Sequence, residues 1–293
     1  MLGFLLQQVP EIPLEGWVES FVDFITSETF EGFFDALEGF LNLLVDVLEA
    51  GLTFLPPLVM VAVFAGLAWL VSNWRIALLT AAGLLLLQGL RLWEDAMLTL
   101  ALVIAATAVA LVVGIPLGIV AAKSRGVETV LRPVLDFMQT MPAFVYLVPA
   151  IVLLGLGAAP ALVAVVIFAM PPAVRLTMLG LQQVSKETVE AASAFGATGW
   201  QTLRKVELPL AMPTIMAGVN QVIMLSLSMV VIAALIGAGG LGEEVYQGLS
   251  QLDVGKSFKG GLGIVIIAIL LDRITRNIRG GGAQKAGSGI KTA

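Results

Sequence analysis

The sequence contains no cysteine and no histidine, and charged residues make up only 13% of its 293 positions. These absences exclude disulfide frameworks, thiol nucleophiles, imidazole bases and the usual zinc sites. The formal net charge of -5 argues against nucleic-acid binding, because phosphate backbones are bound by clustered Lys and Arg. The chain is instead 58% hydrophobic, with a mean hydropathy of +0.98. A soluble fold of this length cannot bury so much apolar surface, so we expect an integral membrane protein.

Long apolar runs bounded by charges, Pro or Gly mark the candidate membrane spans. A span requires roughly 20 mainly apolar residues, somewhat fewer where the bilayer is thinned. Seven runs meet or approach this length, namely residues 53–71, 76–90, 97–122, 141–157, 161–174, 214–236 and 258–271. The stretch from Met1 to Pro10 lacks the basic region and cleavage site of a signal peptide, which predicts that it is retained. We therefore expect an all-α protein with about seven transmembrane helices.

Basic residues are distributed unevenly over the segments between these runs. The first basic residue is Arg75, and alternating spans from there place 13 of the 16 Lys and Arg on one side. Only Arg91, Lys256 and Lys259 fall on the other side. Lys and Arg in short loops favour the cytoplasmic side, so we predict a multi-pass protein of the inner or plasma membrane. Its N-terminus is expected outside and its C-terminus in the cytoplasm, an orientation that one miscounted span would reverse.

The exterior N-terminal segment, residues 1–52, has an acidic and amphipathic pattern. Its apolar residues recur at helical spacing and oppose a row of acidic residues; they are Phe30, Phe33, Phe34, Leu37, Phe40, Leu41, Leu44, Val47 and Leu48. The pattern predicts an amphipathic helix. This helix either lies on the outer leaflet or packs as a scaffold on the bundle or a partner.

The remaining chain is expected to form three parts. Residues 53–90 are expected to contain two peripheral transmembrane helices, and residues 91–276 the core, whose bounds follow from the family resemblance described below. The Gly- and Ser-rich end, residues 277–293, has no apolar periodicity. We expect this end to be a disordered cytoplasmic tail.

The connection between the fifth and sixth predicted spans, residues 180–213, is long for a connector, and long connectors are usually functional. Ser185 is expected to cap a helix that ends at Ala194, and Gly196 to supply the left-handed stop. Thr198 is expected to cap a second helix. The sequence therefore predicts a compact helical hairpin on the cytoplasmic membrane surface.

The same loop has features of a docking surface. Ala191 and Ala192 are small enough to let another surface approach closely, and Glu190 offers a carboxylate to a basic partner. Leu208-Pro209 is expected to end the second helix before the next span. The ordinary alternative is an amphipathic connector with helix caps.

The spacing of these residues is specific. Glu190-Ala191-Ala192, three residues, Gly196, nine residues and then Val206-Glu207-Leu208-Pro209 resemble the EAA loop of ABC importer permeases. The departure from the family's pattern is Val206, where Ile is common. The resemblance implies that the loop forms the coupling helix seated in a cleft of a cytoplasmic ATPase. The implied coupling residues are Glu190, Ala191, Ala192, Gly196, Leu208 and Pro209.

Further segments are similar to glycine betaine/proline betaine permeases, namely residues 139–149, Pro171-Pro172, 208–221 and 239–242. The resemblance implies the type I ABC importer permease fold and import of a quaternary ammonium osmolyte. The implied partners are an ABC ATPase dimer, an extracytoplasmic substrate-binding protein and a second permease copy, taken here as a homodimer. ATP and Mg would belong to the ATPase, and this chain would bind no cofactor and catalyse no reaction.

Four other functions remain as alternatives. They are an ABC permease for another small solute such as an amino acid, a secondary carrier, a membrane enzyme, and a structural or signalling membrane protein. A secondary carrier typically shows buried ionisable residues at membrane depth, and none is obvious. An enzyme without His or Cys would depend on carboxylate or Lys chemistry, and no paired carboxylates occur in the spans.

The residues that line a pathway are less well defined by the sequence. A quaternary ammonium group has no hydrogen to donate, so its recognition relies on aromatic faces, and Phe137, Phe144 and Tyr146 are candidates. Pro142 is a candidate gate hinge. Polar side chains in the sixth span, Asn220 and Gln221, either face a wet pathway or bond between helices. Lipid-facing or core aromatics and a static kink are the alternative interpretations.

Two segments resemble nucleotide-binding motifs by composition alone. Gly237 to Gly242 fits G-x-G-x-x-G, but it follows a predicted transmembrane helix and not a strand. Gly255-Lys256-Ser257 resembles the end of a P-loop, yet Ser250 occupies the position of the required first Gly. We expect both segments to belong to a flexible exterior loop.

Overall fold

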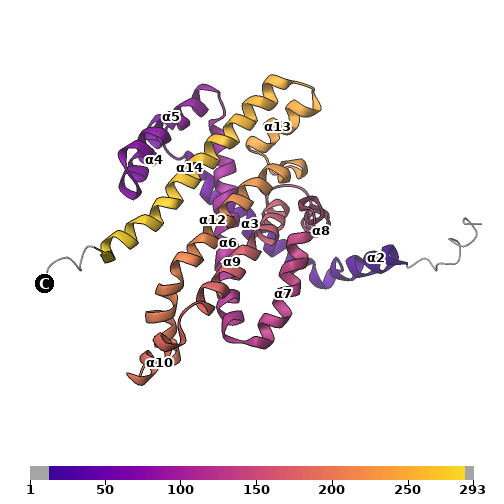
Figure 1. Ribbon diagram of the computed structural model, residues 1–293. Helices are drawn as coiled ribbons and strands as arrows, with labels where there is room; N and C mark the ends of the chain where they lie inside the picture. The colour runs from indigo at the N-terminus through magenta and orange to yellow at the C-terminus, as the bar shows by residue number, and fades with distance from the viewer. Residues whose placement is uncertain (1–12, 288–293) are drawn as a thin grey trace, which may run out of the picture.

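The computed structural model describes residues 13–287, and the regular elements in this range are helices (Figure 1). The helices before residue 183 are α2 Leu14–Ile25, α3 Glu28–Thr53, α4 Pro57–Val71, α5 Trp74–Gly89, α6 Trp93–Lys123, α7 Arg125–Thr140 and α9 Ala158–Gln182, with η1 Ala143–Tyr146 and α8 Leu147–Leu154 between α7 and α9. The rest are α10 Lys186–Ala194, α11 Gly199–Thr202, η2 Leu203–Glu207, α12 Leu208–Ala233, η3 Ala234–Ile236, α13 Leu241–Ser250 and α14 Val254–Gly287. The all-α expectation is confirmed.

Four helices in the described range are long and apolar enough to cross a membrane. They contain α6, α9, the continuous run Gly199–Ile236, and Val254–Thr275 of α14. The number rises to six if two bent helix pairs each form one span. Helices are present at all seven predicted runs, but α4 has 15 residues and α5 has 16, which is short for the roughly 20 that a span requires.

The predicted span 141–157 is not one continuous helix. It begins with the short 3-10 turn η1, continues as the 8-residue α8, and bends by 109° from α7. Met141 precedes a proline and is extended, because the ring of Pro142 disfavours the helical conformation there. Gly155 and Gly157 then end the segment with positive φ angles, which glycine adopts without strain. The run is therefore a broken or re-entrant element.

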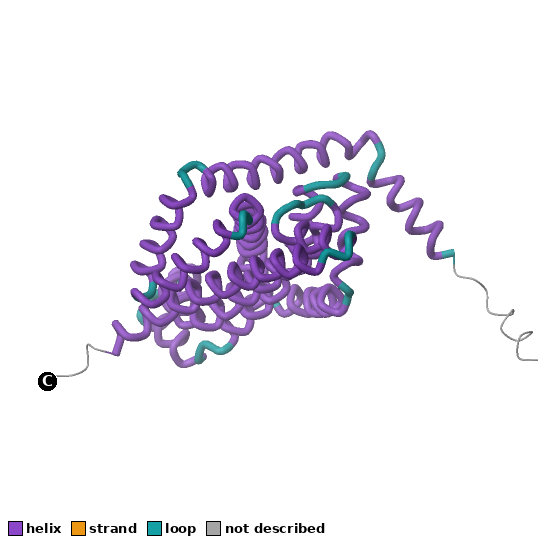
Figure 2. The backbone as a smooth tube through the Cα atoms, turned by 90° about the horizontal axis from the view of Figure 1, so that it is seen from above, coloured by secondary structure: helices purple, strands orange, loops and turns teal. Residues whose placement is uncertain are grey.

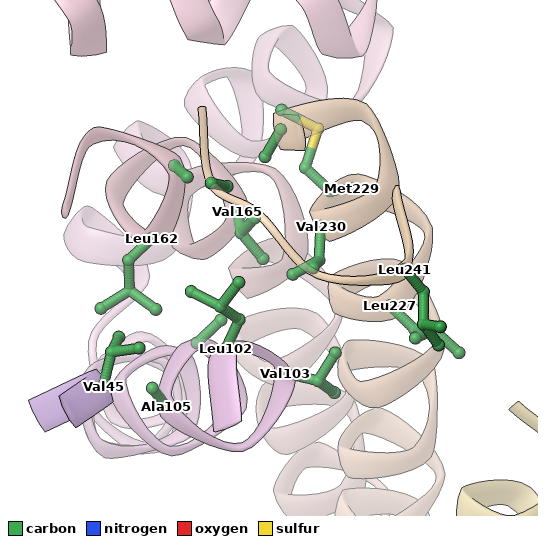
Figure 3. Close-up of a cluster of buried hydrophobic side chains, with 14 of the residues drawn as sticks. Val45, Leu102, Val103, Ala105, Leu162, Val165, Leu227, Met229, Val230 and Leu241 are labelled. Carbon is green, nitrogen blue, oxygen red and sulfur yellow. The ribbon is translucent and has the colours of Figure 1, made fainter. Parts of the chain in front are cut away.

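Small residues allow α6, α9 and α12 to pack closely at the centre of the molecule. A Cβ on Gly118 of α6 would lie 2.7 Å from the carbonyl oxygen of Val174 on α9. A Cβ on Gly180 of α9 would lie 3.1 Å from the carbonyl oxygen of Ala211 on α12. Close backbone approach through small residues is typical of helix pairs in membranes. Figure 3 shows the adjoining apolar core, to which α3, α6, α9 and α12 contribute side chains.

The amphipathic helix α3 lies along one edge of the bundle (Figure 2). Its buried residues Leu41 and Val45 join the core, and Phe34 packs partly buried against the same cluster. This contact supports the scaffold placement on the bundle for this helix. Phe33 and Phe40 on the adjoining face remain exposed, which leaves part of the apolar surface for lipid or another surface.

The segment after α12 is more ordered than the flexible exterior loop that the sequence predicts. It contains helix α13, and Gly240 has a φ of +73°. A Cβ on Gly240 would lie 2.5 Å from Oγ1 of Thr99, so only glycine fits there. The backbone N–H of Leu241 donates to Oγ1 of Thr99 at 2.9 Å, and that hydroxyl donates to the carbonyl of Asp95 at 2.7 Å. Thr99 therefore fixes this turn against α6.

Replacing Thr99 tests the importance of this hydrogen bond. Thr99→Val keeps the shape but leaves the buried N–H of Leu241 without an acceptor, so we expect a loss of about 1–3 kcal/mol of stability. Thr99→Ser retains the hydroxyl and is the matched control. Thermal denaturation of the purified protein in detergent measures both variants, and equal midpoints for Val and Ser would contradict the assignment.

The C-terminal tail differs from expectation. The backbone of residues 277–287 continues α14 as a helix to Gly287, where the sequence predicts disorder. An uninterrupted helical backbone satisfies its own hydrogen bonds even without an apolar face, so the preceding helix extends into a segment that has no periodic pattern. Residues 288–293 of the predicted tail lie outside the described range, as do residues 1–12 of the N-terminal segment.

Candidate functional site: the loop between α9 and α12

The first helix of the loop has the boundaries that the sequence predicts. The Oγ of Ser185 accepts a hydrogen bond from the N–H of Thr188 at 3.4 Å and caps α10. At the other end Gly196 has a φ of +82°. The N–H of Ala197 donates to the carbonyl of Ala192 at 3.1 Å, and the N–H of Gly196 donates to that of Ser193 at 2.9 Å. This pair of bonds is a Schellman motif, which explains the glycine.

The second helix begins as predicted. Thr198 and Gln201 form a capping box, in which each side chain accepts from the backbone N–H of the other residue. Two capped helix starts and one left-handed stop thus fix the direction of the hairpin with few tertiary contacts. Figure 1 shows α10 at the end of the bundle opposite to α13.

The predicted end of the second helix at Leu208-Pro209 is wrong. The helix continues through the π-helical turn η2 into α12, so that residues 199–236 form one continuous helical run. The N–H of Leu208 donates to the carbonyl of Leu203, five residues earlier, and this wider turn lies directly before Pro209. Because the turn is widened there, the chain passes a residue that lacks an N–H without breaking. Leu208 and Pro209 are therefore the first two residues of α12, within a continuous helix.

The surface of the loop is accessible. Glu190, Ala191 and Gly196 are exposed, while Ala192 is half-buried. Two large apolar side chains that the sequence analysis did not select are also exposed, since Phe195 is 93% and Trp200 is 67% accessible. Their signal in the sequence is an aromatic residue on each side of the turn glycine. Exposed aromatics of this kind are typical of protein interfaces.

The sequence also gives no indication of an ion pair at Glu207, the last residue before α12, which we call the base of the loop. Both carboxylate oxygens of Glu207 lie within hydrogen-bonding distance of Nζ of Lys123, at 2.7 and 2.5 Å. The side chain of Glu207 is only 6% exposed, whereas that of Lys123 is 49% exposed. The two residues are 84 positions apart, so no local pattern indicates the pairing.

The aromatic pathway candidates do not gather in one place within the chain. Phe137 at the end of α7 and Phe144 in η1 are exposed, at 64% and 56%. Tyr146 is buried; its hydroxyl donates to the carbonyl of Met138, and its ring lies edge-on to Phe168 at 6.2 Å between centroids. Pro142 lies at the bend between α7 and η1.

The polar candidates have different surroundings from each other. Oδ1 of Asn220 accepts from the hydroxyl of Thr275 on α14 at 3.0 Å, which is the interhelical alternative. Gln221 is exposed. In the range that the structure describes, no group of three or more acidic residues is arranged to hold a metal ion.

The fold and the loop define a class of transport protein. The chain belongs to the family of binding-protein-dependent transport system inner membrane components, whose model matches residues 114–279. The match includes the whole loop between α9 and α12. The chain is therefore a transport permease of the ABC class.

Individual relatives are similar over nearly the whole chain. The glycine betaine transport system permease protein OpuAB of Bacillus subtilis is 50% identical over 274 residues, which cover 94% of this chain and 97% of that relative. The glycine betaine/carnitine transport permease protein GbuB of Listeria monocytogenes is 49% identical, covering 92% and 97%. The glycine betaine/proline betaine transport system permease protein ProW of Escherichia coli is 46% identical, covering 91% and 75%.

A solved structure shows the same fold. The inward-facing MetNI methionine ABC transporter aligns with a TM-score of 0.55 and 24% identity, over 61% of this chain and 92% of that chain. At this identity the likeness concerns the fold alone. It agrees with the expected type I permease architecture for the core.

Proposed function

We propose that this chain is the membrane permease subunit of an ABC importer for glycine betaine, proline betaine or a related quaternary ammonium osmolyte. The observation that carries the proposal is the capped loop with Gly196 in a left-handed conformation, within a chain that is 46 to 50% identical to three betaine permeases. The family's dependence on binding proteins supports an extracytoplasmic substrate-binding protein as one partner.

The proposed orientation places the α10 end of the bundle in the cytoplasm and the α13 end outside. It rests on the bias of Lys and Arg toward one side of the predicted spans, with the N-terminus outside and the C-terminus inside. In this orientation the exposed loop faces the ATPase. ATP and Mg are held by that partner, and the permease contributes no catalytic residue.

We place the ATPase on the surface formed by Glu190, Ala191 and Gly196, together with Phe195. The small residues allow a close approach, and the exposed phenyl ring of Phe195 is suited to fill an apolar pocket of the partner. ATP binding closes the ATPase dimer and moves the loop. The bundle then changes the side to which its pathway opens, provided that the loop makes different contacts in the two states.

A second copy of the permease completes the pathway in this proposal. Phe137, Phe144 and Val148 are each exposed, on α7, η1 and α8 of a single chain, and exposed apolar side chains of this size suit burial against a symmetric partner. Aromatic faces from two copies would then be available to a quaternary ammonium group. Asn220 is already bonded to Thr275, so we assign it to helix packing rather than to the pathway.

Uptake of labelled glycine betaine into proteoliposomes tests the proposed function. The vesicles contain this chain, its ATPase and its binding protein, with or without internal ATP. We expect accumulation only with ATP and all components. Uptake without the ATPase would favour a secondary carrier, whereas coupled uptake of an amino acid but not of betaine would assign the permease to another solute.

A further inference from the structure

The buried carboxylate of Glu207 lies at the point where the exposed loop joins the membrane core. It belongs to the π-helical turn η2, and its residue is 4% exposed. A buried carboxylate is costly unless it is paired, and Lys123 supplies the counter-charge to both of its oxygens. The pair thus fixes the relative positions of two elements that are distant in the sequence.

The π-helical turn determines the direction of the Glu207 side chain. One additional residue in a helical turn rotates the positions before it by about 100° relative to those after it. The turn closes through the bond from the N–H of Leu208 to the carbonyl of Leu203. Pro209 follows this turn, so the widened turn and the contact between Glu207 and Lys123 occur together where α12 begins.

Lys123 lies at the corner between α6 and α7. It is the last residue of α6, Ser124 caps α7 through a bond from the N–H of Val127 at 3.5 Å, and α7 starts at Arg125. Beyond this corner, α7 is amphipathic and mostly exposed, and it ends beside Phe137 and the bend at Pro142. A movement of the corner would therefore be passed along α7 toward the candidate pathway segment.

The packing around the Glu207–Lys123 pair indicates that a movement of the loop is passed on to α6 and not absorbed by bending of the chain at this point. The first turns of α12 pack in an apolar cluster of buried residues, which are Leu181, Leu203, Ala211 and Ile215. In contrast, α10 has no buried residue, and the surface of the loop is exposed. The tightly packed part of the loop is thus the turn η2, where Glu207 contacts Lys123 of α6.

We propose that Glu207 is a positioning residue which, through Lys123, ties the base of the loop to the α6–α7 corner and so transmits loop movement to α7. This inference rests on the proposed function, because it assumes that an ATPase moves the loop. Glu207 and Lys123 lie outside the surface that is proposed to contact the ATPase, and their assigned role is to couple movement of the loop to the membrane helices.

Two single variants that remove a charge, one single variant that keeps it and one double variant test the proposal in the complete transporter with its ATPase and binding protein. For Glu207→Gln and Lys123→Met we expect the complex to assemble and ATP hydrolysis to stay within about twofold, while betaine uptake per ATP falls about tenfold, within the usual range of coupling between sites. Lys123→Arg keeps the positive charge, and its guanidinium can donate to both carboxylate oxygens, so this variant should retain coupling.

The double variant Lys123→Met/Glu207→Leu separates coupling from stability. It leaves no unpaired buried charge, so its thermal midpoint should return toward that of the wild type, while uptake per ATP stays low. Recovery of both properties would show that the pair is only structural and would overturn the proposal, as would unchanged uptake per ATP in Glu207→Gln and Lys123→Met. The exterior pair Lys259 and Glu244, 3.8 Å apart, provides the control variant Lys259→Met, with no expected change in this ratio.

If the wild-type complex fails to import betaine with ATP, the proposed function fails and the coupling inference that rests on it fails too. If the wild-type complex imports betaine and Glu207→Gln and Lys123→Met keep the wild-type ratio of uptake to ATP hydrolysis, only the coupling inference fails. The two failures are therefore distinguishable in one series of vesicles.

Discussion

Gly196→Val is expected to abolish most ATP-dependent uptake while leaving a transporter that still inserts and folds. The φ of +82° at this position is strained for any residue with a Cβ and most strained for a β-branched one. No atom lies within 4 Å of the position that a Cβ would take, so the effect comes from the backbone and not from a clash. The turn after α10 would change direction, and the surface formed by Glu190 and Phe195 would lose its alignment.

The expected size of this effect is a loss of tenfold or more in coupled uptake, since a few ångströms of misplacement at an interface removes its central contacts. Uptake into proteoliposomes and co-purification with the ATPase measure it. Gly196→Asn tolerates the left-handed conformation and should be mild. Gly199→Ala, three residues away, has open space and no positive φ, and is the matched control. Normal uptake by Gly196→Val would refute the role of the turn.

Gly118→Val is expected to have the largest effect on stability. Its Cβ would lie 2.7 Å from the carbonyl oxygen of Val174 and 2.7 Å from Cβ of Thr177, both on α9. Neither atom is the far end of a flexible side chain, so α6 and α9 must move apart at the centre of the bundle. We expect a loss of about 3 kcal/mol or more, or failure to accumulate in the membrane.

Gly66→Val in α4 is the matched control for this variant, because no atom lies within 4 Å of its Cβ position. Thermal denaturation in detergent and the yield of protein in the membrane measure both variants. A midpoint for Gly118→Val equal to that of Gly66→Val would contradict the assigned packing of α6 on α9.

The local signals in the sequence were sufficient where the backbone itself determines the structure. Ser185, Gly196 and Thr198 mark the caps and the stop of the loop, because each acts on hydrogen bonds within four or five residues of its own position. The amphipathic pattern of α3 likewise predicts the helix. It does not decide what covers the apolar face, since lipid and protein are both apolar solvents for it.

Proline was a less dependable signal. Met141-Pro142 breaks the predicted span 141–157, yet Pro171 and Pro172 lie inside the continuous helix α9, and Pro209 lies inside the run from α11 to α12. The difference comes from the surroundings. Pro171 and Pro172 are buried against neighbouring helices, and the π-helical turn accommodates Pro209.

By itself, the sequence determined that this protein is an α-helical membrane protein with a capped, glycine-stopped loop between two apolar helices. Composition, periodicity and capping act over a few residues and can be read in order along the chain. Only the tertiary structure decided the packing of α3 on the bundle, the ordered turn held by Thr99, and the pairing of Glu207 with Lys123. Each of these joins residues that are far apart in the sequence, and such contacts depend on how the helices pack rather than on any local pattern.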